Sequence, residues 1–410
     1  MNEYLIIGNG VAAAAATEGI RSVDKAGTIT IVSEEAHPVY CRPLISYYLE
    51  KKTDISKMNY RDKDFYERNG CKVFYGKKAV RLDPEKKEVK LCDGTVLPYS
   101  KVCIATGSSP FTPDFPGIDT VDKKFGFMTL DDALSLEKAV GKDTRVFIIG
   151  AGLIGLKCAE GLRAMTDSIT VCDLADRVLS SILDSDCAAL MQAHMEKNGI
   201  RFLLSDTVER FDKNKAYMKS GRTVDFDVLV TAVGVKANTS LVKDAGGAVN
   251  RGIITDEHMR TSLNDVYAAG DCCESRDISS GTSHILAILP NAYMQGFAAG
   301  VNMAGGDRIF DNAIPMNSIG FFGLHAMTAG SYEGELIEEK NDRELMKFFV
   351  KDGLLKGFIF IGEPSKTGIY TSLIRERIPL DTIDFELLKK GADYMAFSPE
   401  TRRKKFGGVV

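Results

Sequence analysis

Residues 6–13 read Ile6-Ile7-Gly8-Asn9-Gly10-Val11-Ala12-Ala13, and residues 148–155 repeat the pattern as Ile148-Ile149-Gly150-Ala151-Gly152-Leu153-Ile154-Gly155. Each copy follows a short apolar strand and leads into an expected helix. The first two glycines of such a turn allow the backbone to approach a pyrophosphate, and the third small residue lets helix and strand pack. The helix N-terminus offers free N–H groups and partial positive charge to the phosphates. Two such turns predict two bound dinucleotides.

Each turn is followed by a second strand that ends in a carboxylate. Residues 27–34 form an apolar segment ending at Glu34, and residues 168–173 do the same at Asp173. A carboxylate in this place accepts hydrogen bonds from ribose hydroxyls and repels a 2′-phosphate. Solvated strand-end acids are the alternative, but the complete strand–turn–helix–strand context favours nucleotide binding.

The repetition extends beyond the turns. Glu67-Arg68-Asn69-Gly70 and Glu196-Lys197-Asn198-Gly199 each precede another apolar strand, and each half ends on a strand with a small-residue exit, at 102–107 and 228–234. Self-similarity of this kind indicates a duplicated unit. The sequence therefore predicts an α/β protein with two nested Rossmann-like domains, followed by an α+β C-terminal domain.

Length and composition narrow the class of protein. A chain of 410 residues exceeds what one core usually supports, so two or three domains are expected. The net charge of −4 disfavours a nucleic-acid binder, and no apolar run approaches the length of a membrane span. The first strand begins almost at Met1, which leaves no room for a signal peptide. Nine cysteines without C-x-x-C pairs and histidines without metal spacing favour a reducing cytoplasm and no metal site.

A third signature identifies the family. Val266-Tyr267-Ala268-Ala269-Gly270-Asp271 is another short strand that ends in glycine and a carboxylate. With the two turns and Ala105-Thr106-Gly107, it makes the chain resemble the flavoprotein superfamily that includes the pyridine nucleotide–disulfide oxidoreductases. The resemblance covers essentially the whole chain. It implies FAD at the first turn, NADH at the second, and a hydrogen bond from Asp271 to the ribityl–phosphate region of the flavin.

Residues 37–46 distinguish between subclasses of this superfamily. Disulfide reductases of this superfamily carry a C-x4-C pair beside the flavin, whereas this chain has Cys41 alone and no further cysteine before Cys71. Its Tyr-x-Arg-Pro segment, residues 40–43, instead resembles the NADH:rubredoxin reductases and the flavin portion of NADH-dependent nitrite reductases. That resemblance places Arg42 against the flavin.

The resemblance implies two sets of cofactor contacts. The expected FAD contacts are Gly8, Gly10, Ala12, Ala13, Glu34, Arg42, Pro43, Val80, Ala105, Thr106, Gly107, Asp271, Asn291 and Ala292. The expected NAD contacts are Gly150, Gly152, Ile154, Gly155, Asp173 and Gly234. No arginine occupies the two positions after Asp173, which favours NADH over NADPH, although Arg177 lies four residues on.

Two residues are candidates for a catalytic role. Relatives often place a lysine at the position of Tyr47 and a glutamate at that of Lys157, so the usual ion pair is altered here. Lys157 either supplies a cation that stabilises the reduced flavin or reaches solvent. Cys41 is two residues early for the single redox cysteine of NADH oxidases and peroxidases. The adjacent pair Cys272-Cys273 is either redox-active or simply packed.

The predicted activity is that of an FAD-dependent NADH oxidoreductase that passes electrons to a small redox protein, such as rubredoxin, or to a nitrite-reductase-type partner. One alternative is an NADH oxidase, peroxidase or coenzyme A disulfide reductase that uses Cys41. Another is a flavin-bound sensor or assembly protein without turnover. The basic tail 402–405 either docks an acidic electron carrier or is a solvated terminus.

The domain organisation follows from the nesting. The FAD domain is expected at residues 1–112 and 241–310, the inserted NAD domain at 113–240, and an interface-type domain at 311–410. The chain is expected to be a cytoplasmic monomer or homodimer.

Overall fold

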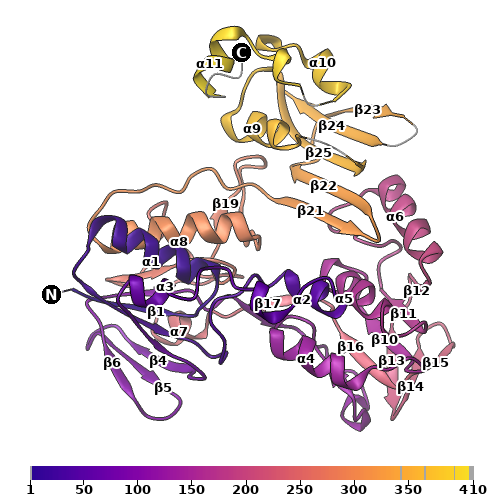
Figure 1. Ribbon diagram of the computed structural model, residues 1–410, viewed down its shortest axis with the longest axis horizontal. Helices are drawn as coiled ribbons and strands as arrows, with labels where there is room; N and C mark the ends of the chain where they lie inside the picture. The colour runs from indigo at the N-terminus through magenta and orange to yellow at the C-terminus, as the bar shows by residue number, and fades with distance from the viewer. Residues whose placement is uncertain (1, 342–343, 364–365, 392, 406–410) are drawn as a thin grey trace. The chain divides into compact units, whose positions relative to one another are not determined.

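The computed structural model describes residues 2–341, 344–363, 366–391 and 393–405 (Figure 1). The chain divides into two compact units. The first comprises Met1–Asp176, Gly199–Arg276 and Ser283–Asp311, and the second comprises Arg177–Asn198, Asp277–Thr282 and Asn312–Val410.

The first unit contains two five-stranded parallel sheets with the same strand order. One runs β18-β7-β1-β2-β3 and the other β9-β16-β10-β11-β12. Their bounds are β1 Glu3–Ile7, β2 Thr28–Val32, β3 Cys71–Phe74, β7 Lys101–Ile104 and β18 Val266–Ala268, then β9 Lys124–Phe125, β10 Val146–Ile149, β11 Ile169–Cys172, β12 Ile200–Leu203 and β16 Val228–Thr231. The central strands β1, β7, β10 and β16 are rich in β-branched residues and almost wholly buried, as inner parallel strands require.

Each parallel sheet is accompanied by a three-stranded antiparallel sheet. The first is β4 Ala79–Asp83, β5 Glu88–Leu91 and β6 Val96–Pro98, and the second is β13 Val208–Asp212, β14 Lys215–Met218 and β15 Thr223–Asp225. The helices of this unit are α1 Val11–Val23, α2 Leu44–Leu49, α3 Phe65–Arg68, α4 Leu130–Ala139, α5 Leu153–Arg163, α7 Ser240–Asp244 and α8 Leu289–Met303. The duplicated, nested α/β fold expected from the sequence is confirmed.

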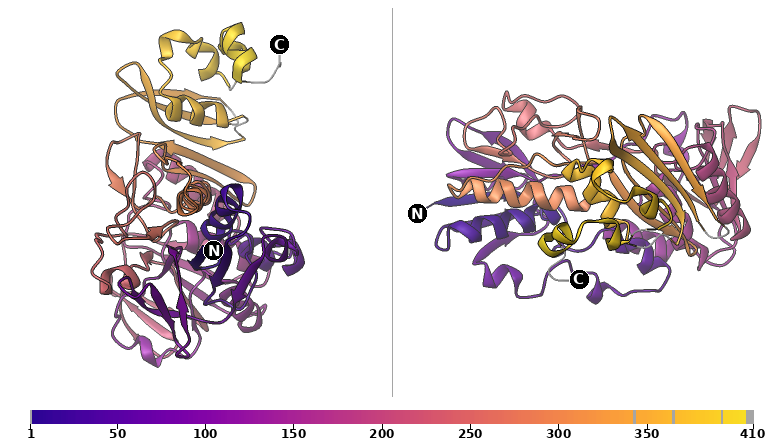
Figure 2. Two further views of the ribbon diagram at one scale, coloured as in Figure 1. Left: turned by 90° about the vertical axis from the view of Figure 1, so that its left-hand side faces the viewer. Right: turned by 90° about the horizontal axis from the view of Figure 1, so that it is seen from above.

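Helices α1 and α8 lie side by side, as both views in Figure 2 show. A Cβ added at Gly296 would lie 2.1 Å from the carbonyl oxygen of Ala12, and one at Gly300 would lie 2.1 Å from that of Ala16. Only glycine allows so close a crossing. The crossing fixes the first turn of α1 against the late segment that carries α8.

A two-stranded ribbon joins the halves of the first unit. Strand β8 (Ser108–Pro110) runs antiparallel to β17 (Val235–Ala237). The ribbon lies where the chain leaves the first parallel sheet and returns to it. The expected FAD and NAD domain boundaries fall beside it and remain a prediction.

The second unit is built on an antiparallel sheet of order β21-β22-β25-β24-β23. The strands are β21 Met316–Phe321, β22 Leu324–Gly330, β23 Glu335–Lys340, β24 Leu345–Lys351 and β25 Leu354–Gly362, and the helices are α6 Ser185–Lys197, α9 Gly368–Glu376, α10 Phe385–Lys389 and α11 Pro399–Lys405. Its core contains a cluster of the aromatic rings of Phe348, Phe358, Phe360 and Tyr370. The tail candidates Arg402 and Arg403 lie in α11, whereas the side chains of Lys404 and Lys405 lie outside the described residues.

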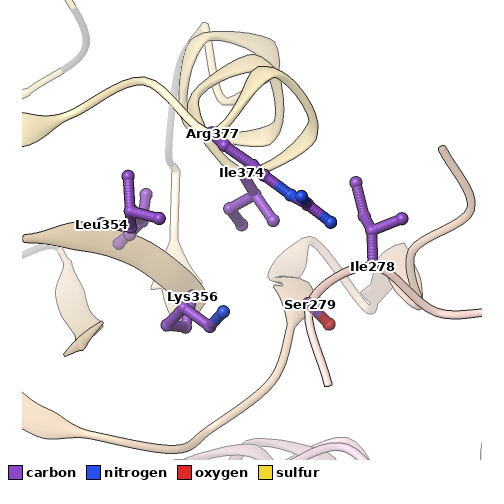
Figure 3. A pocket seen from close by; sticks show the side chains of 7 residues that line it. Ile278, Ser279, Leu354, Lys356, Ile374 and Arg377 are labelled. Atoms are coloured by element: carbon purple, nitrogen blue, oxygen red, sulfur yellow. The ribbon is translucent and has the colours of Figure 1, made fainter. Parts of the chain in front are cut away.

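A small cleft in the second unit is shown in Figure 3. It has a cavity volume of about 10 Å³, beside Ile278, Leu354 and Ile374. Ligand sites usually enclose about 300–1,000 Å³, so this cleft is too small for a dinucleotide. Separately, no helix among the described residues is long and apolar enough to cross a membrane.

Candidate functional site

The first glycine of each turn is required by the backbone. Gly8 has a φ of +117° and Gly150 a φ of +114°, both in the region that favours glycine. A Cβ at Gly8 would lie 2.0 Å from the carbonyl oxygen of Ala105, and one at Gly150 would lie 2.2 Å from that of Ala232. Each turn therefore packs directly on the loop that leaves the neighbouring strand.

The second glycine of each turn faces open space. A Cβ added at Gly10 or Gly152 would meet nothing within 4 Å. Both residues are helix N-caps without a side-chain cap, so the first N–H groups of α1 and α5 are left for another acceptor. Gly107 and Gly234 are likewise open and have positive φ. These two cradles fit the pyrophosphates of two dinucleotides.

The two strand-end acids differ in how firmly they are held. The Asp173 carboxylate accepts the N–H of Ala151 at 2.6 Å and that of Ala175 at 2.8 Å, which fixes it beside the second turn. The Glu34 carboxylate is 67% exposed and pairs with Lys78 at 2.9 Å. Asp173 is thus pre-oriented for a ribose, whereas Glu34 would have to leave a surface ion pair.

The remaining predicted contacts lie around the same turns. A Cβ at Gly155 would lie 1.9 Å from the carbonyl oxygen of Gly150, so this third small residue lets α5 pack on its own turn. Ile154 is half-buried in the first turn of α5. Val80 is half-exposed on β4, three residues after Lys77, whose N–H bonds to the Ser33 carbonyl at 2.8 Å. Their assignment as cofactor contacts remains a prediction.

Arg42 ties two segments of the first unit together. Its guanidinium donates to the Met128 carbonyl at 2.5 Å and to Glu35 at 2.6 Å. The Tyr40 hydroxyl donates to the same carboxylate at 2.7 Å and accepts the Leu130 N–H at 2.9 Å. Pro43, the next residue, is the N-cap of α2. The sequence singled out Arg42 and Pro43 but gave no signal for Glu35 as the carboxylate that orients Arg42.

Asp271 follows β18 in a turn that a buried side chain holds. Burial raises the pKa of Asp271 above its ordinary value, and the Arg42 charge opposes that rise. The N–H of Gly270 donates to the side-chain oxygen of Gln295 at 2.7 Å, and the Gln295 amide donates to Ser275 at 2.5 Å. The role of Gln295 in fixing this turn was not predicted from the sequence.

Two further predicted contacts, Asn291 and Ala292, are buried in the first turn of α8. Ala12 and Ala13 are buried in the first turn of α1, which packs against α8. These predicted contacts therefore lie on two helix starts that the glycine crossing holds together.

Lys157 lies between α2 and α5 and is only 15% exposed. Its ammonium pairs with Glu160, lies 4.0 Å from a Glu50 oxygen and sits 4.8 Å from the centroid of the Tyr47 ring. Both carboxylates are buried, with exposed side-chain fractions of 4% and 8%. Glu160 lies three residues after Lys157 in the same helix, a spacing that indicates an ion pair from the sequence, whereas no pattern marked Glu50.

The cysteines singled out by the sequence differ, because a hydrogen bond from the Cys273 thiol lowers the pKa of Cys272 whereas the pKa of Cys41 is raised. Burial raises the pKa of the half-buried Cys41 thiol, which opposes formation of a nucleophilic thiolate. Cys272 and Cys273 are fully buried, and their thiols donate to the carbonyls of Ile104 and Gly270 at 3.3 Å. Within the described ranges, no group of three or more His, Cys, Asp or Glu residues could hold a metal ion.

Comparison with known proteins agrees with this geometry. The family model described as "Pyridine nucleotide-disulphide oxidoreductase" matches residues 2–296, which include both turns and the Asp271 signature. The chain belongs to this family.

Individual relatives cover most of the chain. The chain is 34% identical to the NADH-dependent phenylglyoxylate dehydrogenase subunit epsilon of Aromatoleum evansii, over 92% of each chain. It is 31% identical to the nitrite reductase [NAD(P)H] of Bacillus subtilis, over 88% of this chain but only 44% of that protein. Among solved structures, NADH:rubredoxin oxidoreductase from Clostridium acetobutylicum matches 93% of this chain and 96% of its own, with a TM-score of 0.75 and 25% identity.

Family membership confirms several predictions. The superfamily, the oxidoreductase class, and FAD and NADH as cofactors all agree with the family and the relatives. The individual contact residues remain predictions.

Proposed function

We propose that this chain oxidises NADH through bound FAD and passes the electrons to a separate small iron-containing protein such as a rubredoxin. The observation that carries the proposal is the pair of equivalent turns, each open at its second glycine and uncapped at its helix. One binds FAD at Gly8 and the other binds NADH at Gly150. FAD supplies the chemistry when bound, because it takes a hydride from NADH and releases electrons to an acceptor.

The chain's own residues bind and orient the two cofactors. The N–H groups at the starts of α1 and α5 hold the pyrophosphates, and the fixed carboxylate of Asp173 binds the NADH ribose. Arg42 contributes a positively charged group to flavin binding, and Asp271 contributes a carboxyl group. Lys157 is the candidate cation for the reduced flavin, and Glu160 and Glu50 offset its charge until the flavin is reduced.

The acceptor is inferred from what the Cys41 segment lacks. Cys41 has no second cysteine at C-x4-C spacing, and its raised pKa disfavours thiolate chemistry. The missing second cysteine weighs against disulfide chemistry that needs a cysteine pair, and the raised pKa of Cys41 weighs against coenzyme A disulfide or peroxide as the substrate. An external one-electron carrier requires no thiol, and the similar Clostridium acetobutylicum structure is named for rubredoxin.

A second candidate is a flavin subunit of an enzyme that oxidises a 2-oxo acid. The match to the phenylglyoxylate dehydrogenase subunit epsilon spans 92% of both chains, which favours this role. In that setting the electrons would flow from the partner subunits through the flavin to NAD⁺.

Anaerobic mixing with NADH tests the proposal. The flavin absorbance should bleach with NADH and recover when oxidised rubredoxin or ferredoxin is added. Faster recovery with oxygen, peroxide or coenzyme A disulfide than with either iron protein would refute the acceptor assignment. Failure of NADH to bleach the flavin would refute the proposal as a whole and favour the sensor class.

Three organisational features complete the proposal. The FAD domain is residues 1–112 and 241–310, the NAD domain is 113–240, and 311–410 form an interface domain. The protein works in the cytoplasm as a monomer or homodimer. Sedimentation at several concentrations distinguishes the two states.

A further inference from the structure

The ribbon of β8 and β17 connects two equivalent loops of the nested domains. Ala105-Thr106-Gly107 leaves β7 and leads into β8, whereas Ala232-Val233-Gly234 leaves β16 and leads into β17. Each loop packs on the first glycine of its own turn. The ribbon therefore links the loop beside the flavin turn directly to the loop beside the nicotinamide turn.

The ladder of the ribbon continues into both loops. At one end the Phe111 N–H donates to the Gly234 carbonyl at 3.0 Å, and at the other the Asn238 N–H donates to the Gly107 carbonyl at 3.0 Å. Three residue pairs lie between them, from Ser108 with Ala237 to Pro110 with Val235. A two-stranded ribbon this short is marginal by itself, so it needs further support to hold a fixed register.

Asn238 supplies that support at the flavin end. Its side-chain amide donates to the Thr106 carbonyl at 2.9 Å, and its side-chain oxygen accepts the Ser109 hydroxyl at 2.8 Å. The Thr106 hydroxyl donates to the Asn238 carbonyl at 2.8 Å. Together with its backbone N–H, which donates to Gly107, Asn238 makes four hydrogen bonds to Thr106, Gly107 and Ser109 of the outgoing chain. Both the hydroxyl and the carbonyl of Thr106 are bound in this way.

We propose that Asn238 is a positioning residue that sets the spacing between the two cofactor loops, an inference that rests on the proposed function. Hydride transfer requires the donor and acceptor atoms at about 3–3.5 Å, and a displacement of 1 Å can slow such a step about 100-fold. Asn238 acts on this distance through Thr106 and Gly107, without contacting either ring.

The test compares two changes at Asn238 with a matched control. Asn238→Ala removes both side-chain bonds, while the isosteric Asn238→Asp keeps the Ser109 bond and turns a carboxylate oxygen toward the Thr106 carbonyl. Asn302→Ala is the control, because Asn302 is a buried amide that also joins separate segments, by donating to the carbonyls of His258 at 2.9 Å and Arg308 at 2.7 Å.

Two measurements report on the proposal. Stopped-flow reduction of the FAD-loaded protein at saturating NADH should slow about 10- to 100-fold in both Asn238 variants and less than twofold in Asn302→Ala. Hydrogen exchange of the cofactor-free protein should accelerate in peptides spanning 106–112 and 233–239 for the Asn238 variants alone. If Asn238→Ala does not fold, the same two measurements on Asn238→Asp test the proposal.

The outcomes separate this inference from the proposed function. Wild-type rates and wild-type exchange in Asn238→Asp would overturn the positioning role while leaving the function intact. A wild-type protein whose flavin is not reduced by NADH would overturn the function. Equal slowing by Asn302→Ala would show a general loss of stability and would also overturn the positioning role.

Discussion

Substitution of Gly152 by alanine should separate cofactor binding from folding. Gly152 has a φ of −84° and a ψ of −175°, an extended conformation that any L-residue adopts. The added methyl would meet nothing within 4 Å, so no protein atom resists it. Alanine is a poorer N-cap than glycine, but it also lowers the entropy of the unfolded chain, which stabilises the folded state by about 0.4–1 kcal/mol. The free energy of unfolding should therefore change by no more than about 1 kcal/mol.

The same methyl occupies the space assigned to the NADH pyrophosphate. We expect NADH to bind at least about tenfold more weakly, which corresponds to about 1.4 kcal/mol. Gly150→Ala should behave differently, because its φ of +114° and a contact of 2.2 Å with the Ala232 carbonyl both penalise the folded state. The strained backbone alone costs about 1–3 kcal/mol.

Three measurements check this reasoning. FAD content is read from the visible absorbance, stability from thermal unfolding, and NADH affinity from the concentration dependence of anaerobic flavin bleaching. Gly152→Ala should keep its FAD and its melting temperature and lose NADH affinity, whereas Gly10→Ala should keep its fold and lose FAD. Wild-type NADH affinity in a folded Gly152→Ala protein would refute the placement of the pyrophosphate.

Four further outcomes follow from the geometry. Cys41→Ser should leave turnover with iron proteins, oxygen, peroxide and coenzyme A disulfide unchanged, and a loss with any of them would restore the thiol mechanism. The wild-type protein should have a higher kcat/KM with NADH than with NADPH, and a higher value with NADPH would contradict this. Asp173→Ser should weaken the binding of NADH about tenfold, because a hydrogen bond to a charged group is worth about 1.5–3 kcal/mol. Lys157→Met should lower the free energy of unfolding, because it leaves the buried Glu160 carboxylate without its cation, whereas Glu50 keeps its ion pair with Lys52. Adding Glu160→Gln should restore part of the loss, and additive losses would argue against the ion pair. Lys347 is 3% exposed and pairs with Asp184 at 2.7 Å. Burial lowers the pKa of Lys347, but its ion pairs outweigh burial and raise the pKa above the ordinary 10.5. The stabilisation by these ion pairs is therefore fully present below pH 10.5 and is lost as the pH rises above that value. Lys347→Met should cost about 1.5–3 kcal/mol in denaturant unfolding near pH 7, because the carboxylates left behind remain partly solvated, and an unchanged midpoint would count against that ion pair.

The sequence predicted the parts of the fold that short-range patterns specify. Gly8 and Gly150 could be assigned because only glycine adopts the backbone of that turn, and the duplicated order of strands followed from the same repeat. The family resemblance then supplied Arg42 and Asp271 as candidate contacts.

The partners of these residues could not be predicted, because they depend on contacts distant in sequence. Glu35 and Glu34 are adjacent acids, yet one orients Arg42 and the other pairs with Lys78 at the surface. The bonds of Asn238 to Thr106 span 132 positions, so no local pattern could indicate them. The approach of the distant Glu50 to Lys157 likewise became visible only when α2 and α5 were brought together.

The placement of β18 at the edge of the first parallel sheet has a consequence for folding during synthesis. The strands of the second parallel sheet all lie between residues 124 and 231, whereas the first sheet is completed only by β18 at Val266–Ala268. A chain that has just emerged to residue 231 can complete the inserted sheet while β7 still exposes an unpaired edge and α1 lacks α8. Such exposed edges and apolar helix faces promote misassociation. Early folding of the insert shortens the effective loop between β8 and β17 and so brings β18 to that edge sooner.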